Sequence, residues 1–290
     1  MRQETQPVSR SYANPDVLSF YQQLPFNYFG DTNAAAAAIR DTNMIQYYPV
    51  LPPLLTKGIR VLDVGSGAGW FVNGVNYHYA RHGSSASGVD FNAVAVKQAR
   101  EIASHLGVQS TFVESDLFAF QTSEPFALVT SFGVLHHTDN CIAGLRHLLR
   151  DLVGEGGYAF IGLYHRYGRK PFLDYFDDLK KSGMGKEDLQ REFMELRSGS
   201  GDKIHDLSWF YDQVLHPHET QHTLEEMLPV LHAEGMELVA TSINRFEAFD
   251  SEEDLIEREK SYYALALQRL KDKIYFPGFF LFFARKTGRT

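Results

Sequence analysis

The chain has 290 residues, 44% hydrophobic and 22% charged, an ordinary globular composition long enough for one elaborated domain or two small ones. Its formal net charge is −8 without a Lys/Arg block, which disfavours a nucleic-acid partner. The single cysteine, Cys141, excludes an intrachain disulfide and paired-cysteine zinc or iron–sulfur sites. No apolar run reaches the roughly 20 residues of a membrane span, and the start lacks an apolar targeting core. We therefore expect a soluble cytoplasmic protein without a membrane partner.

The first 58 residues predict a helical N-terminal segment. Thr32 or Asn33 is expected to cap a helix through the AAAAAIR run, and Pro52 with Pro53 is expected to end the segment. Aromatic residues gather just before this helix. They either pack on the sheet as a strap or close over a ligand, and the candidates for substrate contact there are Tyr21, Asn27 and Tyr28.

From residue 59 the sequence alternates between short apolar runs and stretches with helical spacing. Such an alternation predicts βαβ units in a parallel sheet that is buried on both faces. The predicted strands are 59–64, 86–91, 110–115, 126–134 and 158–164, and the predicted helices are 68–82, 92–107 and 141–157.

The alternation breaks after residue 165. Residues 166–215 are charged and helical, and an insertion of this length favours a lid over a bound substrate, with an oligomer contact, such as a homodimer, as the alternative. The order then resumes with a helix at 224–233, a strand at 237–244, a helix at 252–273 and an apolar, interior strand at 278–284. The prediction is an α/β fold with a Rossmann-like, mostly parallel seven-stranded sheet and helices on both faces. Its parts are a helical strap (1–58), a core (59–165), a helical lid insertion (166–222) and the completion of the core (223–290).

The stretch HPHETQH at 216–222 fits the H-E-x-x-H pattern of zinc peptidases, which needs both histidines on one face of a helix. The local signals place the helix later, because Thr223 and Glu226 form a capping box and the apolar positions start only at Leu224. A loop is therefore predicted, and a zinc peptidase is rejected. A polar loop lining a substrate pocket is favoured over a different metal site or a solvated loop, so no metal is predicted. The candidate substrate contacts in it are His216, Glu219 and His222.

The strongest motif is VLDVGSGAGW at 61–70, a strand followed by Asp63, three alternating glycines and a helix. Glycines let the turn pass tightly and let backbone N–H groups approach a ligand. The nicotinamide fingerprint is not met, because Trp70 stands where its third glycine falls. Two further acids, Asp90 and Asp116, end the next two strands. Acids at successive strand ends face one crevice, where a carboxylate can take a vicinal diol with two hydrogen bonds.

Over residues 58–165 these motifs resemble, in order, those of class I S-adenosylmethionine-dependent methyltransferases, in the small-molecule, menaquinone-type branch. The D-x-G-x-G-x-G stretch resembles their first motif, and the resemblance implies S-adenosylmethionine as cofactor and S-adenosylhomocysteine as product. GVDFN at 88–92 resembles the second motif, whose acid binds the ribose, and ESDLFAF at 114–120 resembles the third, whose acid meets the adenine. The implied cofactor-binding residues are Asp63, Gly65, Gly67, Gly69, Asp90, Phe91, Asp116, Leu117 and Phe132.

Eight of the 12 histidines lie between residues 136 and 222. Methyl transfer from a sulfonium is an in-line displacement that needs alignment and exclusion of water, and a general base helps only if the nucleophile carries a proton of high pKa. Histidine suits that role near neutral pH. We expect His205 to be solvated. The catalytic candidates are His136, His137 and His218, and Tyr164 and His165 at the end of the fifth strand are further candidate substrate contacts.

The sequence thus predicts an enzyme that moves a methyl group to oxygen or nitrogen of a small-molecule acceptor. A tRNA or other nucleic-acid methyltransferase is the first alternative. The acidic charge disfavours it, as does SFGV at 131–134, where amino-base methylases carry an N/D-P-P-Y/F motif. A non-catalytic protein that only binds the cofactor is the second alternative, and the intact glycine turn and acids argue against it.

Overall fold

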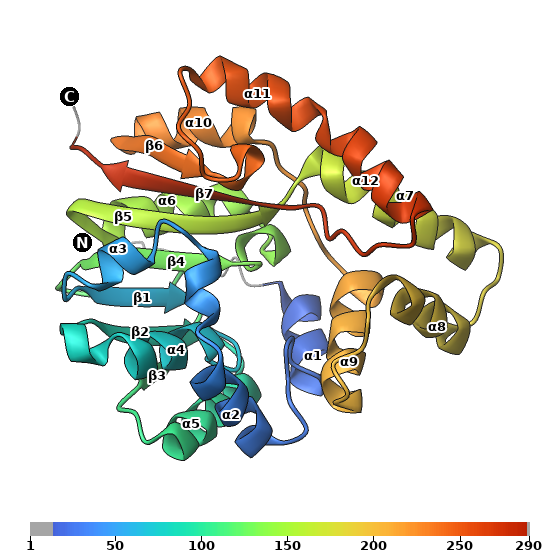
Figure 1. The fold of residues 1–290 in the computed structure, drawn as a ribbon, viewed down its shortest axis with the longest axis horizontal. Helices are drawn as coiled ribbons and strands as arrows, with labels where there is room; N and C mark the ends of the chain where they lie inside the picture. The colour runs from blue at the N-terminus through green and yellow to red at the C-terminus, as the bar shows by residue number, and fades with distance from the viewer. Residues whose placement is uncertain (1–13, 289–290) are drawn as a thin grey trace, which may run out of the picture.

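The computed structural model describes residues 14–288, so residues 1–13 of the predicted strap and residues 289–290 lie outside the described part (Figure 1). Seven strands form one sheet in the order β3-β2-β1-β4-β5-β7-β6. Neighbours pair in parallel except β7, which runs antiparallel to β5 and β6. The predicted Rossmann-like, mostly parallel sheet is confirmed, with its last strand in the interior. The strands are β1 Arg60–Val64, β2 Ser85–Asp90, β3 Thr111–Glu114, β4 Phe126–Phe132, β5 Val153–Tyr164, β6 Met236–Thr241 and β7 Phe279–Lys286.

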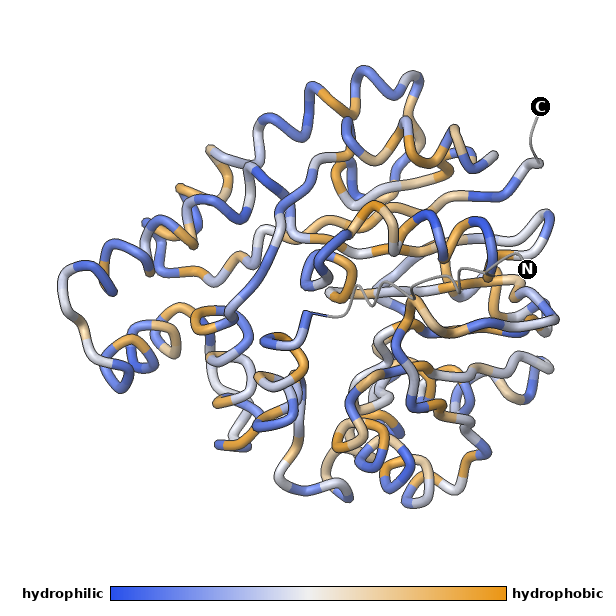
Figure 2. Tube along the Cα trace, turned by 180° about the vertical axis from the view of Figure 1, so that it is seen from behind, coloured by the Kyte–Doolittle hydropathy of each residue, from blue (hydrophilic) through white to orange (hydrophobic). Residues whose placement is uncertain are grey.

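Helices cover both faces of the sheet, as the apolar strands require. Val61 of β1 belongs to a core shared with Phe71 of α4, whereas the next residue, Leu62, belongs to a core shared with Leu145 of α6 and Leu231 of α10. Figure 2 shows hydrophobic residues gathered along the central strands. The helices are α1 Pro15–Gln23, α2 Thr32–Asp41, α3 Pro52–Leu55, α4 Trp70–His78, α5 Ala93–Leu106, α6 Cys141–His147, α7 Arg166–Lys181, α8 Lys186–Leu196, α9 Lys203–Phe210, α10 Leu224–Ala233, α11 Glu252–Lys260 and α12 Tyr262–Lys271.

Two helix boundaries differ from the prediction. The helix expected over 141–157 ends early: α6 passes into a π-helical turn at Leu148–Leu152, and β5 begins at Val153. Val153 already pairs with Phe126, and the glycine-rich stretch after it forms a bulge in the strand, where glycine costs less than in a helix. The single helix expected over 252–273 is two helices separated at Ser261.

The N-terminal segment is helical as expected, but the residues predicted to cap a helix and to end the segment have other positions in the structure. The cap of α2 is Asp31, whose carboxylate accepts the N–H of Asn33 at 2.8 Å, and Thr32 already belongs to the helix. Pro52 and Pro53 begin the short helix α3 rather than end the segment. Proline suits the first helical positions because their N–H groups have no partner within the helix.

The insertion is helical and has a core of its own. Helices α7, α8 and α9 and a π-helical turn at Tyr211–Leu215 share a hydrophobic cluster that includes Phe176 and Phe193. Figure 1 shows α9 beside α1, and α7 beside α12. Residues 216–222 form the predicted loop, and α10 starts after the predicted capping box. None of the helices within residues 14–288 is long and apolar enough to cross a membrane.

Candidate functional site

The site begins at the glycine turn after β1. Gly65 has a φ of 75°, and a Cβ atom there would stand 2.2 Å from the side chain of Val134, so only glycine fits. Gly69, at a φ of 77°, is the N-cap of α4. The N–H of Gly67 donates to the carboxylate of Asp90 at 2.8 Å. The turn therefore links β1 to α4 while it contacts the end of β2 and the loop after β4.

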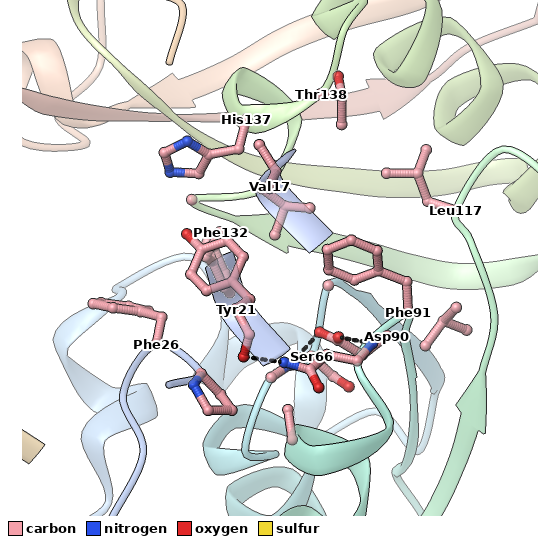
Figure 3. Close-up of a pocket in the computed structure, with 18 of the residues that line it drawn as sticks. Val17, Tyr21, Phe26, Ser66, Asp90, Phe91, Leu117, Phe132, His137 and Thr138 are labelled. Carbon is pink, nitrogen blue, oxygen red and sulfur yellow. Dashed lines mark hydrogen bonds between the residues drawn. The ribbon is translucent and has the colours of Figure 1, made fainter. Parts of the chain in front are cut away.

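A cavity of about 150 Å³ lies at the carboxyl ends of the strands, beside the glycine turn (Figure 3). We call it the cofactor cavity. Asp63 and Gly69 are not among the residues that line it. Seven of the predicted cofactor-binding residues do line it: Gly65, Gly67, Asp90, Phe91, Asp116, Leu117 and Phe132.

Asp63 lies outside the cofactor cavity and contacts β4. Its side chain is buried, and one oxygen accepts the hydroxyl of Thr130 at 2.6 Å. Burial raises the pKa of Asp63 to about 7, although the bond from Thr130 opposes this. The structure therefore places Asp63 as a support of the β1–β4 pair rather than in the cavity wall.

Asp90 and Asp116 present carboxylates to the cofactor cavity. Burial raises the pKa of Asp90, while the N–H groups of Asn92 and Gly67, each at 2.8 Å, stabilise its ionised form. One oxygen of Asp116 accepts the N–H of Phe118 at 2.8 Å. An ionised carboxylate has about four lone-pair sites, so both acids retain acceptor capacity for hydroxyl or amino groups of a ligand. These donor and acceptor groups fit a nucleoside.

Helix α1 and the segment after it cover the cofactor cavity. The side chain of Asn92 donates to the carbonyl of Tyr21 at 2.7 Å and ties α1 to the start of α5. Tyr21 and Asn27 line the cavity, whereas Tyr28 does not. The volume is below the roughly 300 Å³ at which ligand pockets usually start. The cofactor cavity is thus narrow where α1 covers it.

Asn27 also joins this cover to the insertion. Its side-chain oxygen accepts hydrogen bonds from the His205 ring at 2.7 Å and from the Trp209 indole at 3.3 Å. His205 is therefore buried against the N-terminal segment, and the expectation of a solvated side chain was wrong. The aromatic ring of Phe29 stacks on it, which shields the imidazole from water.

A second cavity, of about 690 Å³, adjoins the first, and ten of its 27 lining residues are Phe, Tyr or Trp. We call it the aromatic cavity. Six residues line both cavities, namely Phe26, Asn27, Ala68, Trp70, Phe132 and Gly133. The other aromatic residues in its wall are Phe29, Tyr47, Tyr48, Tyr164, Trp209, Tyr275 and Phe279, which come from the strap, the sheet and the insertion.

One end of the aromatic cavity is polar and centres on Asp212. The hydroxyl of Tyr21 donates to its carboxylate at 2.5 Å, and the amide of Gln213 donates at 2.7 Å. That amide also lies 2.7 Å from the hydroxyl of Tyr164. Burial raises the pKa of Asp212, and the bond from Tyr21 opposes this. The strap, β5 and the insertion thus meet in one buried polar cluster.

The three catalytic candidates have different surroundings. His137 lines the cofactor cavity, and its Nδ1–H donates to the carbonyl of His218 at 2.9 Å, which leaves a lone pair on Nε2. Burial lowers the pKa of His137, so the neutral form prevails. His136 is fully buried and accepts the N–H of Tyr164 at 3.2 Å. His218 lies 3.2 Å from the carbonyl of Thr138. Of the three, His137 lines the cofactor cavity, and neither His136 nor His218 lines this cavity or the aromatic cavity.

His216 comes from the HPHETQH loop and lies against His137, with ring centroids 3.8 Å apart. Candidate ligand atoms of His137, Asp212 and His216 lie within 4.8 Å of one another, and such a donor set can suit a transition metal. However, Nδ1 of His216 accepts the N–H of His218 at 3.1 Å, so in the neutral ring the proton sits on Nε2. Within residues 14–288 that Nε2 is buried without a hydrogen-bond partner, and it offers a donor instead of a lone pair. This geometry favours a hydrogen-bonding role for His216 over metal binding.

The remaining predicted substrate contacts lie mostly outside the two cavities. Glu219 forms two bonds to Arg169, at 2.9 and 3.1 Å, and His165 pairs with Glu259 at 3.0 Å in the interior. His222 lines neither cavity, whereas Tyr164 lines the aromatic cavity. The loop therefore mainly braces the end of β5, and no two of its histidines share a helix face.

Sequence reasoning missed the polar end of the aromatic cavity. Asp212 and Gln213 lie in the insertion, and neither belongs to a strand end or a motif. The only available signal was their place between the aromatic run SWFY and the histidine loop. Trp209 and Tyr275 likewise reach the cavity from segments whose pattern predicts only helix or loop.

Comparison with known proteins agrees with this geometry. Residues 55–166 match the family model described as a methyltransferase domain. The fold is similar to that of PKMT2 from Rickettsia typhi in complex with AdoHcy, at 12% identity and a TM-score of 0.57, over 91% of this chain and 54% of that one. It is also similar to magnesium protoporphyrin IX methyltransferase (ChlM) from Synechocystis PCC 6803 with bound SAH, at 15% identity and a TM-score of 0.50, over 85% of this chain and 82% of that one. The chain therefore spans about half the length of PKMT2. No curated protein sequence matches the chain.

The family match covers the glycine turn and the acids of the cofactor cavity, and both structural neighbours were solved with the demethylated cofactor. Residues 55–166 thus match a methyltransferase domain, and the chain has the fold of S-adenosylmethionine-dependent methyltransferases.

Proposed function

We propose that the enzyme transfers a methyl group to a small-molecule acceptor bound in the aromatic cavity. The observation that carries this proposal is the shared wall between the two cavities, which includes Trp70, Phe132 and Gly133. A ligand in one cavity is thus held next to a ligand in the other. The volume of about 690 Å³ falls within the usual range of roughly 300–1,000 Å³ for small-molecule sites.

The residues of the cofactor cavity have distinct tasks in this proposal. Asp90 would hold the ribose hydroxyls, and Asp116 would meet the adenine, which Phe91 and Leu117 would contact. When bound, S-adenosylmethionine supplies a methyl group activated by its sulfonium. The protein aligns the acceptor atom with that methyl group and excludes water, and α1 and the insertion provide the cover.

His137 is the proposed general base. Its Nε2 carries a lone pair because Nδ1–H is engaged by the carbonyl of His218, and burial keeps the ring neutral by lowering its pKa. A neutral imidazole beside the cofactor cavity can accept the proton that an oxygen or nitrogen nucleophile gives up. The nearby carboxylate of Asp212 would stabilise the imidazolium that results, since its charge acts to raise the pKa of His137.

Three features support a small acceptor over a nucleic acid. The aromatic cavity is mainly apolar, the strap and the insertion cover it, and the net charge is −8. A nucleic-acid substrate would need a basic surface around the site to contact its phosphates. We extend the proposal to a lid role for α7–α9, because Trp209 and Asp212 of this insertion form part of the cavity wall.

Transfer of a labelled methyl group tests the proposal. The full chain is incubated with methyl-labelled S-adenosylmethionine and, separately, with the small-molecule, protein and nucleic-acid fractions of a bacterial extract. Label is expected in organic-extractable small molecules, and the Asp90→Ala variant should abolish its transfer. Label confined to nucleic acid or protein would contradict the proposal.

A further inference from the structure

Asp212 is a buried carboxylate whose hydrogen-bond donors are all neutral. Only 4% of the residue is exposed, and its partners are Tyr21 at 2.5 Å, Gln213 at 2.7 Å and Tyr164 at 3.4 Å. Within the described residues it forms no ion pair. A buried carboxylate without a cation is costly, so the site gains free energy when a positive charge arrives.

The neighbouring side chains do not supply that charge. The charge of Arg169 acts on Asp212, but this guanidinium is paired with Glu219 and donates its other hydrogen bonds to Gln213. His137 and His216 are held neutral, because burial lowers the pKa of each ring. With Arg169 and Glu219 balanced, an ionised Asp212 gives this end of the aromatic cavity a formal charge of −1. Burial raises the pKa of Asp212, and an arriving cation would stabilise its ionised form.

The rest of the cavity also favours a cation. Tyr48, Trp70, Phe132, Trp209 and Tyr275 line it, and the faces of such rings attract positive charge within about 6 Å. An aromatic wall with one carboxylate at its end is a suitable environment for an ammonium group attached to an apolar body.

Resting on the proposed function, we infer that the methyl acceptor is an apolar amine that enters as an ammonium and is bound by Asp212. The ammonium gives one proton to Nε2 of His137, which leaves a neutral amine with a lone pair. That lone pair forms the new N–C bond while the S–C bond breaks and its electron pair stays on sulfur. The products are a methylated ammonium, S-adenosylhomocysteine and, until it loses its proton to solvent, an imidazolium at His137.

An oxygen acceptor fits this end of the cavity less well. A hydroxyl nucleophile develops negative charge as it loses its proton, and a buried carboxylate nearby opposes that charge. The nitrogen of an amine is positive as the bound ammonium and becomes positive again as the N–C bond forms, so Asp212 stabilises both the bound form and the methylated product. The charge on Asp212 therefore selects nitrogen over oxygen.

The test uses phenethylamine and its neutral counterpart 2-phenylethanol as probes on the full chain saturated with S-adenosylhomocysteine, with affinity measured by calorimetry. The amine is expected to bind about tenfold or more tighter than the alcohol, which corresponds to one hydrogen bond to a charged group. The Asp212→Asn variant should lose this preference. Asp174→Asn removes the same charge from an exposed position on α7, where the carboxylate pairs with Lys170, and should keep it.

The outcomes separate this inference from the proposed function. If S-adenosylhomocysteine itself does not bind, the methyltransferase function fails. If it binds but the alcohol matches the amine in the wild-type protein, the cofactor site stands and the amine inference is overturned. The comparison of the two probes in the wild-type protein decides the amine inference even if Asp212→Asn folds poorly. Thermal melting of Asp212→Asn and Asp174→Asn shows whether either variant is unfolded.

Discussion

The hydroxyl of Tyr21 lies 2.5 Å from a carboxylate oxygen of Asp212, and 191 positions separate the two residues in the chain. Tyr21 lines the cofactor cavity and Asp212 lines the aromatic cavity, so this bond spans the boundary between them. It also fastens the N-terminal helix α1 to the insertion. The bond therefore connects the helix that covers the cofactor cavity to the insertion that walls the aromatic cavity.

Removal of the hydrogen bond between Tyr21 and Asp212 should destabilise the folded protein. For Tyr21→Phe we expect the free energy of unfolding to fall by about 1.5–3 kcal/mol, the usual contribution of a hydrogen bond to a charged group. Denaturant unfolding of the wild type and of Tyr21→Phe measures this loss in the free energy of unfolding. Tyr28→Phe is the matched control, because Tyr28 is half-buried, lines neither cavity and has no hydrogen bond from its hydroxyl within the described residues. Equal losses in the two variants would show that the bond to Asp212 has no special role.

The glycine turn should tolerate no side chain at Gly65. An added Cβ would stand 2.2 Å from Val134, and the residue has a φ of 75°. We expect Gly65→Ala to abolish binding of S-adenosylhomocysteine, measured by calorimetry. Gly156→Ala controls for the backbone cost, because Gly156 has a φ of 71° but no atom within 4 Å of an added Cβ. If Gly65→Ala binds the nucleoside as Gly156→Ala does, the turn is not the tight element described here.

Stability should fall as the pH rises, in part because of Asp63. Its pKa is raised from 3.8 to about 7 in the folded protein, so the folded state favours the protonated carboxyl. The contribution of Asp63 to the free energy of unfolding is fully present below about pH 4 and is lost as the pH rises through about 7. The free energy of unfolding changes by about 4 kcal/mol at most. Asp63→Asn should therefore melt at a higher temperature than the wild type at pH 8, with a smaller difference at pH 5. A melting difference that does not change with pH would contradict this assignment.

His137 should matter for the chemical step more than for folding. With the acceptor identified by the labelling experiment, we expect His137→Gln to lower kcat by about 10²- to 10⁴-fold. Because burial lowers the pKa of His137, the acidic fall of kcat/KM in the wild type should lie below pH 6.5, and the variant should lack it. His232→Gln, which changes a half-exposed surface imidazole paired with Glu252, should behave as the wild type. An unchanged pH profile in His137→Gln would exclude His137 as the base.

The fold could be predicted because its signals are local. Apolar runs bounded by glycines mark each strand, and helical spacing marks the segments between them. The predicted boundaries were wrong where contacts with residues distant in the sequence set the start of an element. For example, β5 starts at Val153 because Phe126 pairs with it, and no local pattern reveals this pairing. The capping box at Thr223 was read correctly because both of its hydrogen bonds are made within four residues.

The cofactor cavity was largely predictable for a related reason. Asp90 and Asp116 follow strands, and parallel topology brings strand ends to one edge. The acceptor side was not predictable, because Asp212 reaches the cavity through the packing of an insertion whose sequence shows only helical character. His136 and His137 are adjacent in sequence and their ring centroids are 4.3 Å apart, yet only His137 lines the cofactor cavity.

Calorimetric titration of S-adenosylhomocysteine into the full chain and into Asp90→Ala tests the central claim most directly. A cavity in which Asp90 takes the ribose diol predicts micromolar affinity in the wild type and a loss of about 10- to 100-fold or more in the variant. Asp174→Asn, an equal change of charge on the exposed face of α7, should bind as the wild type does. Absence of binding to the wild type, or equal affinity of wild type and Asp90→Ala, would contradict the account.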